Sequence, residues 1–132
     1  MTKDTEERRD ALWDQGLETR RAVVGDAYVD RSLEAMDGFN DALQDFITRT
    51  AWGEIWNRPG LSRRDRSLLN IGMLVALGAE AELKLHLMGA LRNGVTRDEI
   101  KECILQSAIY CGGPKALEAT RVARAAFEEY DN

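Results

Sequence analysis

Apolar residues recur at every third or fourth position over most of this chain, and glycine is the residue that most often interrupts the pattern. This period matches one face of an α-helix, whereas a half-buried strand alternates every second residue. The sequence holds only two prolines and few runs of β-branched residues, so little in it opposes helix formation. The chain is therefore predicted to be a small all-α domain of about six helices.

The predicted helices begin and end at known signals. Ser62 and Thr96 each stand three residues before an acid, which is the spacing of a capping box at a helix start. Gly94 and Gly112 are expected to end helices, and Pro114 suits the first turn of the last one. We expect helices over 3–24, shortly after 30, 40–50, 63–77, 80–93, 97–111 and 114–129, with the irregular segment AWGEIWNRPG over 51–60.

Length and charge narrow the class of protein. A chain of 132 residues suits one domain, and we expect residues 1–132 to form it. The 18 basic and 23 acidic residues give a net charge of −5 without long blocks of either sign, so no nucleic-acid partner is expected. No apolar run is long enough for a membrane span, and the charged start MTKDTEERRD lacks the core of a signal peptide, which predicts a cytoplasmic protein.

The single histidine, His86, is the first candidate for chemistry, with Glu82 four residues before it. On a helix both would share a face, where the carboxylate can orient the imidazole and raise its basicity, as a general acid or base requires. Gly89 and Ala90, one turn later, would let a ligand or a neighbouring helix approach closely. An ordinary surface pair and tight helix packing would produce the same pattern, so both interpretations stay open.

Three arginines and two tryptophans form the second group of candidates. The first-turn arginines Arg63, Arg64 and Arg66 stand where cations oppose the helix dipole, which suits an anionic ligand or carboxylates of another subunit; a solvated surface is the alternative. The tryptophan pair, Trp52 and Trp56, could line a pocket or belong to a core or an interface.

Other motifs exclude several kinds of chemistry. Cys103 and Cys111 lie eight residues apart, outside any redox CxxC or disulfide pattern, and are expected to be buried thiols. One histidine and two separated cysteines supply no recognisable metal-ligand set. Signature motifs of serine hydrolases, nucleotide enzymes and zinc proteases are missing from the sequence, so neither a metal nor a cofactor is expected.

A family resemblance is carried by two long segments, WGEIWNRPGLSRRDRSLLNIGMLVALG and ELKLHLMGALRNGVTRDEIKECILQSAIYCGGPKA. They resemble the carboxymuconolactone decarboxylase family, and the earlier LETRRAVVGDAYVDRSLEAMDGFN is similar to it too, so the likeness runs roughly from Trp13 to Phe127. Alkylhydroperoxidase-like relatives carry a redox CxxC before a histidine. With that histidine placed on His86, the two thiol positions hold Ala79 and Glu82, which disfavours peroxidase chemistry.

The resemblance implies an all-helical, alkylhydroperoxidase-like fold that assembles into a ring-shaped homo-oligomer, a hexamer or a trimer. It also implies decarboxylation of the lactone dicarboxylate 4-carboxymuconolactone to 3-oxoadipate enol-lactone, in the β-ketoadipate route of protocatechuate breakdown. Electrons left by CO2 would run through the ring double bond into the lactone carbonyl and form a dienolate. Because the substrate is its own electron sink, the resemblance implies no cofactor.

The same resemblance implies roles for the candidate residues. His86 would protonate the ring carbon, and Glu82 would orient the imidazole. One or more first-turn arginines would pair with the substrate carboxylates, and the tryptophan pair would favour CO2 loss by excluding water. Tyr110 is a further candidate proton donor, or else an aromatic residue of an interface.

Two other functions stay open at this point: a thiol peroxidase or reductant that uses Cys103 or Cys111, and a non-catalytic helical assembly module. Apolar residues around the central helix also exceed what one thin domain is expected to cover, which predicts a homo-oligomer. These apolar residues include Trp52, Trp56, Leu61, Ile71, Met73 and Leu74.

Overall fold

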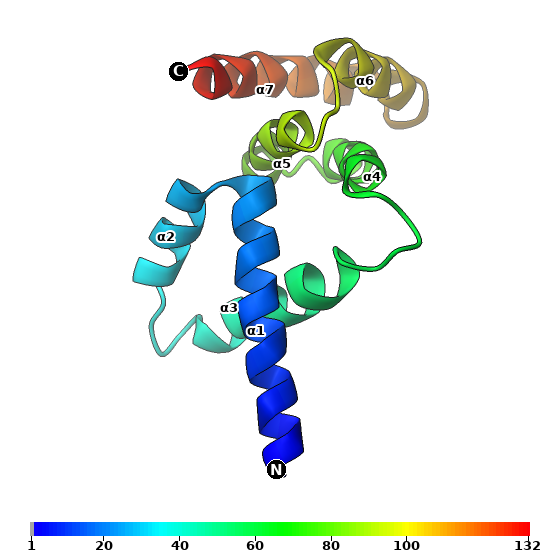
Figure 1. Ribbon diagram of the computed structural model, residues 1–132. Coiled ribbons are helices and arrows are strands. Elements are labelled where there is room, and N and C mark those ends of the chain that lie inside the picture. Colours follow the sequence, from blue (N-terminus) through cyan, green and yellow to red (C-terminus); the bar gives the residue numbers. More distant parts are fainter. Residues whose placement is uncertain (1) are drawn as a thin grey trace. The chain divides into compact units, whose positions relative to one another are not determined.

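The computed structural model describes residues 2–132, and all of its regular elements are helices (Figure 1). The prediction of an all-α chain is therefore confirmed, with seven α-helices and one π-helix in the described residues. Their bounds are α1 Lys3–Val24, α2 Asp26–Glu34, α3 Asp41–Phe46, η1 Ile47–Ile55, α4 Arg63–Leu77, α5 Glu80–Arg92, α6 Arg97–Cys111 and α7 Gly113–Asp131.

The described chain divides into two compact units, unit 1 over residues 2–60 and unit 2 over residues 61–132. The single domain expected over residues 1–132 stays a prediction. Among residues 2–132, no helix combines the length and the apolar character that crossing a bilayer would require.

Helix ends agree with the predicted signals in most places. The ranges predicted for α1, α4 and α6 match the structure to the residue. The Ser62 side chain accepts a hydrogen bond from the Asp65 amide at 3.1 Å, and Thr96 and Glu99 form a reciprocal capping box. The predicted start of the second helix, after Asp30, is wrong, because α2 begins directly after the turn at Gly25.

The prediction that residues 51–60 are irregular is wrong for the first half of this segment. The π-helix η1 continues through Ile55, and the Trp56 amide donates to the Ala51 carbonyl, five residues earlier, at 2.9 Å. Glycine and tryptophan suggested a break here, but a π-helix has a wider turn and keeps the backbone hydrogen-bonded.

Unit 1 is built on a very close contact between α1 and η1. A Cβ atom placed on Gly16 would lie 2.0 Å from the carbonyl oxygen of Thr48, and one placed on Gly53 would lie 2.7 Å from that of Leu12. Both distances are shorter than any normal contact of a methyl group, so only glycine allows the two backbones to approach this closely.

Unit 2 consists of two layers, with α4 and α5 in one and α6 and α7 in the other (Figure 1). Its core joins all four helices through apolar side chains that are almost fully buried. The members are Ile71, Val75, Leu83, Leu87, Ala90, Val95, Ile100, Ala119, Ala123 and Ala126. Because α7 contributes only alanines to this buried set, its backbone can lie close to the neighbouring helices.

The predicted exposed apolar surface is only partly present. Trp52, Trp56 and Ile71 are buried, so the expectation that they add to such a surface is wrong; their rings and side chain fill space inside the chain instead. Other apolar side chains are strongly exposed, with Phe39 at 98% and Ile109 at 80% of their full accessible area. Leu61 and Met73, which belong to the predicted set, are exposed at 42% and 46%. The homo-oligomer stays a prediction.

We expect Gly16→Ala to destabilise the chain by about 2 kcal/mol, because the new methyl group would overlap the Thr48 carbonyl and the helices would have to separate. Thermal or urea unfolding of the purified chain measures this change. The matched control is Gly72→Ala in α4, where nothing lies within 4 Å of the added Cβ and better helix propensity should stabilise by about 0.5–1 kcal/mol. Equal effects of the two substitutions would contradict the close contact.

Candidate functional site

The environment of His86 is set by its place on α5. The residue is half-buried, and its sequence neighbours Leu85 and Leu87 are buried. Burial removes water that would stabilise an imidazolium ion, and it lowers the pKa of His86 from 6.5 to about 4. At neutral pH the side chain is therefore an uncharged imidazole.

Asn70 of α4 lies beside this imidazole. Its amide nitrogen Nδ2 is 3.4 Å from Nδ1 of His86, a long but directed contact between two half-buried side chains. With the amide donating, Nδ1 accepts and the ring hydrogen lies on Nε2. Asn70 was not predicted from the sequence; its signal is an asparagine within the apolar run LLNIGMLVALG.

A second polar contact aligns α4 with α5. Asn93 donates from Nδ2 to the hydroxyl of Ser67 at 2.9 Å and lies 3.4 Å from the carbonyl oxygen of Arg63. Ser67 is completely buried, so losing this partner would leave a polar group unsatisfied in the core. The contact thereby holds α4 in the position that brings Asn70 to His86.

Glu82 lies one turn before His86 on α5, as the spacing predicted, and is exposed. Ala79, at the other position where redox relatives carry a thiol, is the residue directly before α5. The orienting role of Glu82 stays a prediction.

The structure separates the three first-turn arginines. Arg64 is directed toward α6, where it forms an ion pair with Glu99, and it also lies 3.4 Å from Asp65. Arg63 and Arg66 stand seven and four residues before Asn70, so they share its face of α4. Arg66, one turn from Asn70, is half-buried, and Arg63, one turn further away, is exposed.

The remaining predicted residues lie elsewhere. Trp52 and Trp56 belong to unit 1, where their rings stack with centroids 5.0 Å apart and an angle of 18° between the planes. Tyr110 is near the end of α6 and is 80% exposed. Their roles in a pocket or as a proton donor stay predictions.

The two cysteines lie on the same helix, α6. A separation of eight residues along a helix corresponds to roughly 12 Å, well beyond the roughly 7 Å limit for Cα atoms joined by a disulfide. Burial also raises the pKa of the Cys103 thiol, which reduces the fraction of reactive thiolate. Cys103 and Cys111 are half-buried, so the expectation of fully buried thiols holds only in part.

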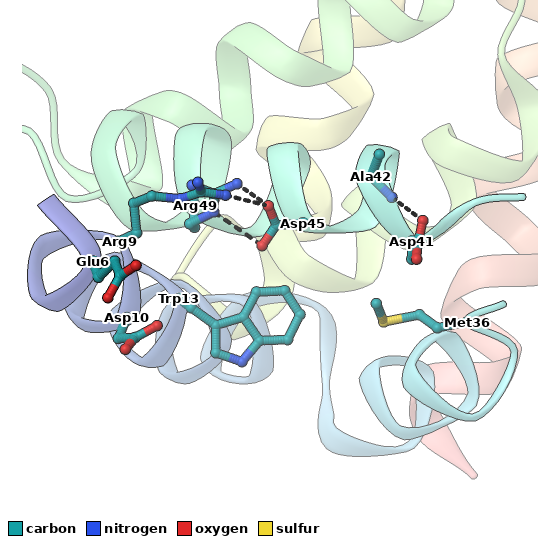
Figure 2. A pocket seen from close by; sticks show the side chains of 9 residues that line it. All are labelled: Glu6, Arg9, Asp10, Trp13, Met36, Asp41, Ala42, Asp45 and Arg49. Carbon is teal, nitrogen blue, oxygen red and sulfur yellow. Dashed lines mark hydrogen bonds and ion pairs between the residues drawn. The ribbon is translucent and has the colours of Figure 1, made fainter. Parts of the chain in front are cut away.

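A large cavity in unit 1 contains none of the predicted residues (Figure 2). It measures about 710 Å³ and its charged lining consists of four carboxylates and two guanidinium groups. Both guanidinium groups, those of Arg9 and Arg49, are directed at Asp45, as Figure 2 shows. Its excess of negative charge makes this cavity a poor site for a dianion. Within residues 2–132, no cluster of three histidine, cysteine or acidic side chains could hold a metal ion.

Comparison with known proteins finds one family model and several relatives that match most of the chain. A model of the carboxymuconolactone decarboxylase family matches residues 41–125. A 4-carboxymuconolactone decarboxylase of Acinetobacter baylyi is 50% identical over 115 residues, which cover 87% of this chain and 86% of the relative. A nitrosuccinic acid decarboxylase of Metarhizium robertsii is 44% identical over 123 residues, covering 93% of this chain and 85% of the relative.

The lowered pKa of His86 predicts a loss of stability in acid. Above pH 6.5 neither the folded nor the unfolded state binds the proton, but between pH 6.5 and about 4 only the unfolded state does. Folding stability should therefore fall by about 3 kcal/mol over this range because of His86 alone. Urea unfolding at several pH values measures the loss, and in His86→Gln this contribution should vanish.

Nuclear magnetic resonance gives a direct control, since the chain has one histidine and its imidazole signal is unambiguous. The signal should titrate near pH 4 in the unmodified chain. In Asn70→Asp a carboxylate would face Nδ1 and raise the pKa of His86 toward its ordinary value. An ordinary pKa in the unmodified, folded chain would contradict the buried environment.

Proposed function

The chain belongs to the carboxymuconolactone decarboxylase family, and we propose that it removes CO2 from 4-carboxymuconolactone without a cofactor. One structural observation carries the mechanism: a half-buried, uncharged imidazole contacts an amide from the facing helix, within the region that the family model matches. Two relatives, each similar over most of this chain, are both named for a decarboxylation.

The chemistry common to the two named substrates defines the task. In 4-carboxymuconolactone the bond from the γ carbon to its carboxylate breaks. The electron pair moves through the ring double bond to the carbonyl oxygen of the lactone. In nitrosuccinic acid the equivalent electron pair can move into the nitro group. Each substrate carries two carboxylates and its own electron acceptor, and each reaction ends when a proton is added to carbon. The protein must therefore hold a dianion and deliver one proton.

His86 is the proton donor in this proposal. The imidazole is neutral in the unliganded chain, but a dianion bound beside it would favour the imidazolium form and raise its pKa. In the imidazolium form Nδ1–H donates to the Asn70 side chain, whose amide must present its oxygen, and Nε2 is left to give its proton to the ring carbon next to the lactone carbonyl. Asn70 is then a positioning residue, and Glu82 assists the imidazole from the preceding turn of α5.

The arginines on one face of α4 are proposed to bind the carboxylate that the substrate keeps. Arg66 is proposed to pair with the acetate carboxylate of the substrate, with Arg63 at the outer end of the same face of α4. The departing carboxylate needs the opposite treatment, because a strong ion pair would oppose its release as neutral CO2. The role of the tryptophan pair in favouring this release stays a prediction from the sequence.

The thiol alternative lacks its chemical requirements. Cys103 and Cys111 cannot pair with each other along α6, and the thiol positions of redox relatives hold Ala79 and Glu82. Exposed apolar side chains such as Phe39 and Ile109 support assembly into a homo-oligomer, for which we propose a hexamer or a trimer. A cytoplasmic location and a place in protocatechuate breakdown are part of the same proposal.

We expect the purified chain to consume 4-carboxymuconolactone with release of CO2, and His86→Gln to lower kcat at least about a hundredfold because the proton donor is lost. Ultraviolet absorbance follows the conjugated lactone. The matched control is Lys84→Gln, two residues away on α5, where the side chain pairs with Glu129 at 3.1 Å and activity should change less than about twofold.

The same assay tests the choice of substrate and of mechanism. Faster turnover of 2-nitrosuccinate would replace the proposed substrate and keep the mechanism. A folded chain that releases CO2 from neither acid would refute the proposed function. Full activity in His86→Gln would remove the histidine from the mechanism. Full activity in a variant without cysteines would exclude a thiol mechanism.

Two arginine variants distinguish substrate binding from helix pairing. Arg66→Gln should raise KM at least about tenfold, since a charge-assisted contact to a carboxylate contributes about 1.5–3 kcal/mol. Arg64→Gln should leave KM within about twofold and cost less than about 1 kcal/mol of stability, because its pair with Glu99 is partly exposed. Steady-state kinetics and urea unfolding measure both. A larger rise in KM for Arg64→Gln would reverse the assignment.

A further inference from the structure

Arg20 is the only charged side chain among the buried residues of the chain from 2 to 132, with 4% of its surface exposed. It lies on α1 in unit 1, on the buried face that also carries Gly16 and Val23. The mechanism proposed above does not use it. A guanidinium group that loses its water of hydration normally gains a carboxylate in exchange.

The groups that contact the guanidinium of Arg20 are all uncharged. Its Nη1 donates to the side-chain oxygen of Gln44 at 3.0 Å and lies 3.4 Å from the hydroxyl of Thr48. The guanidinium carbon lies 5.7 Å from the centre of the Tyr28 ring. The group forms no ion pair with any residue from 2 to 132.

The unused edge of the guanidinium group has a defined geometry. Nε is buried and finds no hydrogen-bond acceptor among the described residues. Both hydrogen bonds of the group leave from Nη1, so the edge formed by Nε and Nη2 donates to no described residue. These two parallel N–H groups match the two oxygens of one carboxylate.

The surrounding charges favour a carboxylate over a phosphate or sulfate. The next cation along the helix, Arg21, is already paired with Asp30 at 2.8 Å and with Asp26 at 3.3 Å. A single guanidinium edge carries one positive charge, and its two N–H groups lie in one plane. This geometry suits a planar group with one negative charge. A tetrahedral dianion would need further donors.

We propose that the Nε and Nη2 edge of Arg20 binds the carboxylate of a small organic acid in unit 1, with Gln44 and Thr48 holding the guanidinium group in place. Side chains that cover Arg20 must move aside to admit the ligand. The proposal stands independently of the decarboxylation, because its measurement is binding and not turnover. Dicarboxylates such as the proposed substrate belong to the same chemical class.

Thermal unfolding with succinate as the probe tests the site. At a succinate concentration about tenfold above Kd, the Tm of the unmodified chain should rise by roughly 4 °C, and sodium sulfate at equal ionic strength should not reproduce the rise. Arg20→Met should abolish the rise while keeping or increasing the Tm without ligand, since it removes a buried charge. The control Arg31→Met removes one exposed charge from α2 and should keep the full rise.

No rise in the unmodified chain, an equal rise in Arg20→Met, or an equal rise with sulfate would overturn the proposal. A second measurement covers the case in which Arg20→Met fails to fold. The Nε–H resonance of Arg20 in the unmodified chain should shift during a titration with succinate. An unshifted resonance at saturating succinate would overturn the proposal as well. The two proposals fail separately. A chain that decarboxylates its substrate but does not bind succinate refutes only the Arg20 site, and a chain that binds succinate without turnover refutes only the decarboxylation.

Discussion

The packing of α4 against α5 is the constraint on which the candidate site depends. Ser67 is completely buried and finds its partner in Asn93, so sliding one helix along the other would leave a hydroxyl and an amide unsatisfied. The apolar core beside this contact, which includes Ile71 and Leu87, favours the same alignment. The alignment brings Asn70 to the imidazole of His86, although neither residue belongs to the contact that sets it.

Burial at the edge of this core has a chemical consequence. It lowers the pKa of His86 to about 4, so the free chain presents a neutral ring. In the proposed reaction the negative charge of the substrate would restore the proton affinity that burial removes. His86 would then become protonated, and able to deliver a proton, only when a dianion is bound beside it.

Arginines of this chain have different roles although their side chains are chemically identical. Arg64 pairs with Glu99, the same acid that caps α6, so it joins two helices. Arg66 lies on the face of α4 that leads to Asn70, and Arg20 is buried among uncharged groups in unit 1. Arg64 and Arg20 differ in the groups they contact, a carboxylate for Arg64 and uncharged side chains for Arg20.

The sequence by itself determined the helical class, most helix ends and the candidacy of His86, because these depend on period, capping residues and the scarcity of acid–base groups. Only the tertiary structure showed the π-helix, the burial of the tryptophan pair, and the contacts of Asn70 and Arg20. Those contacts join residues 16 and 24 positions apart, and a pattern that repeats every three or four residues says nothing about partners at that separation.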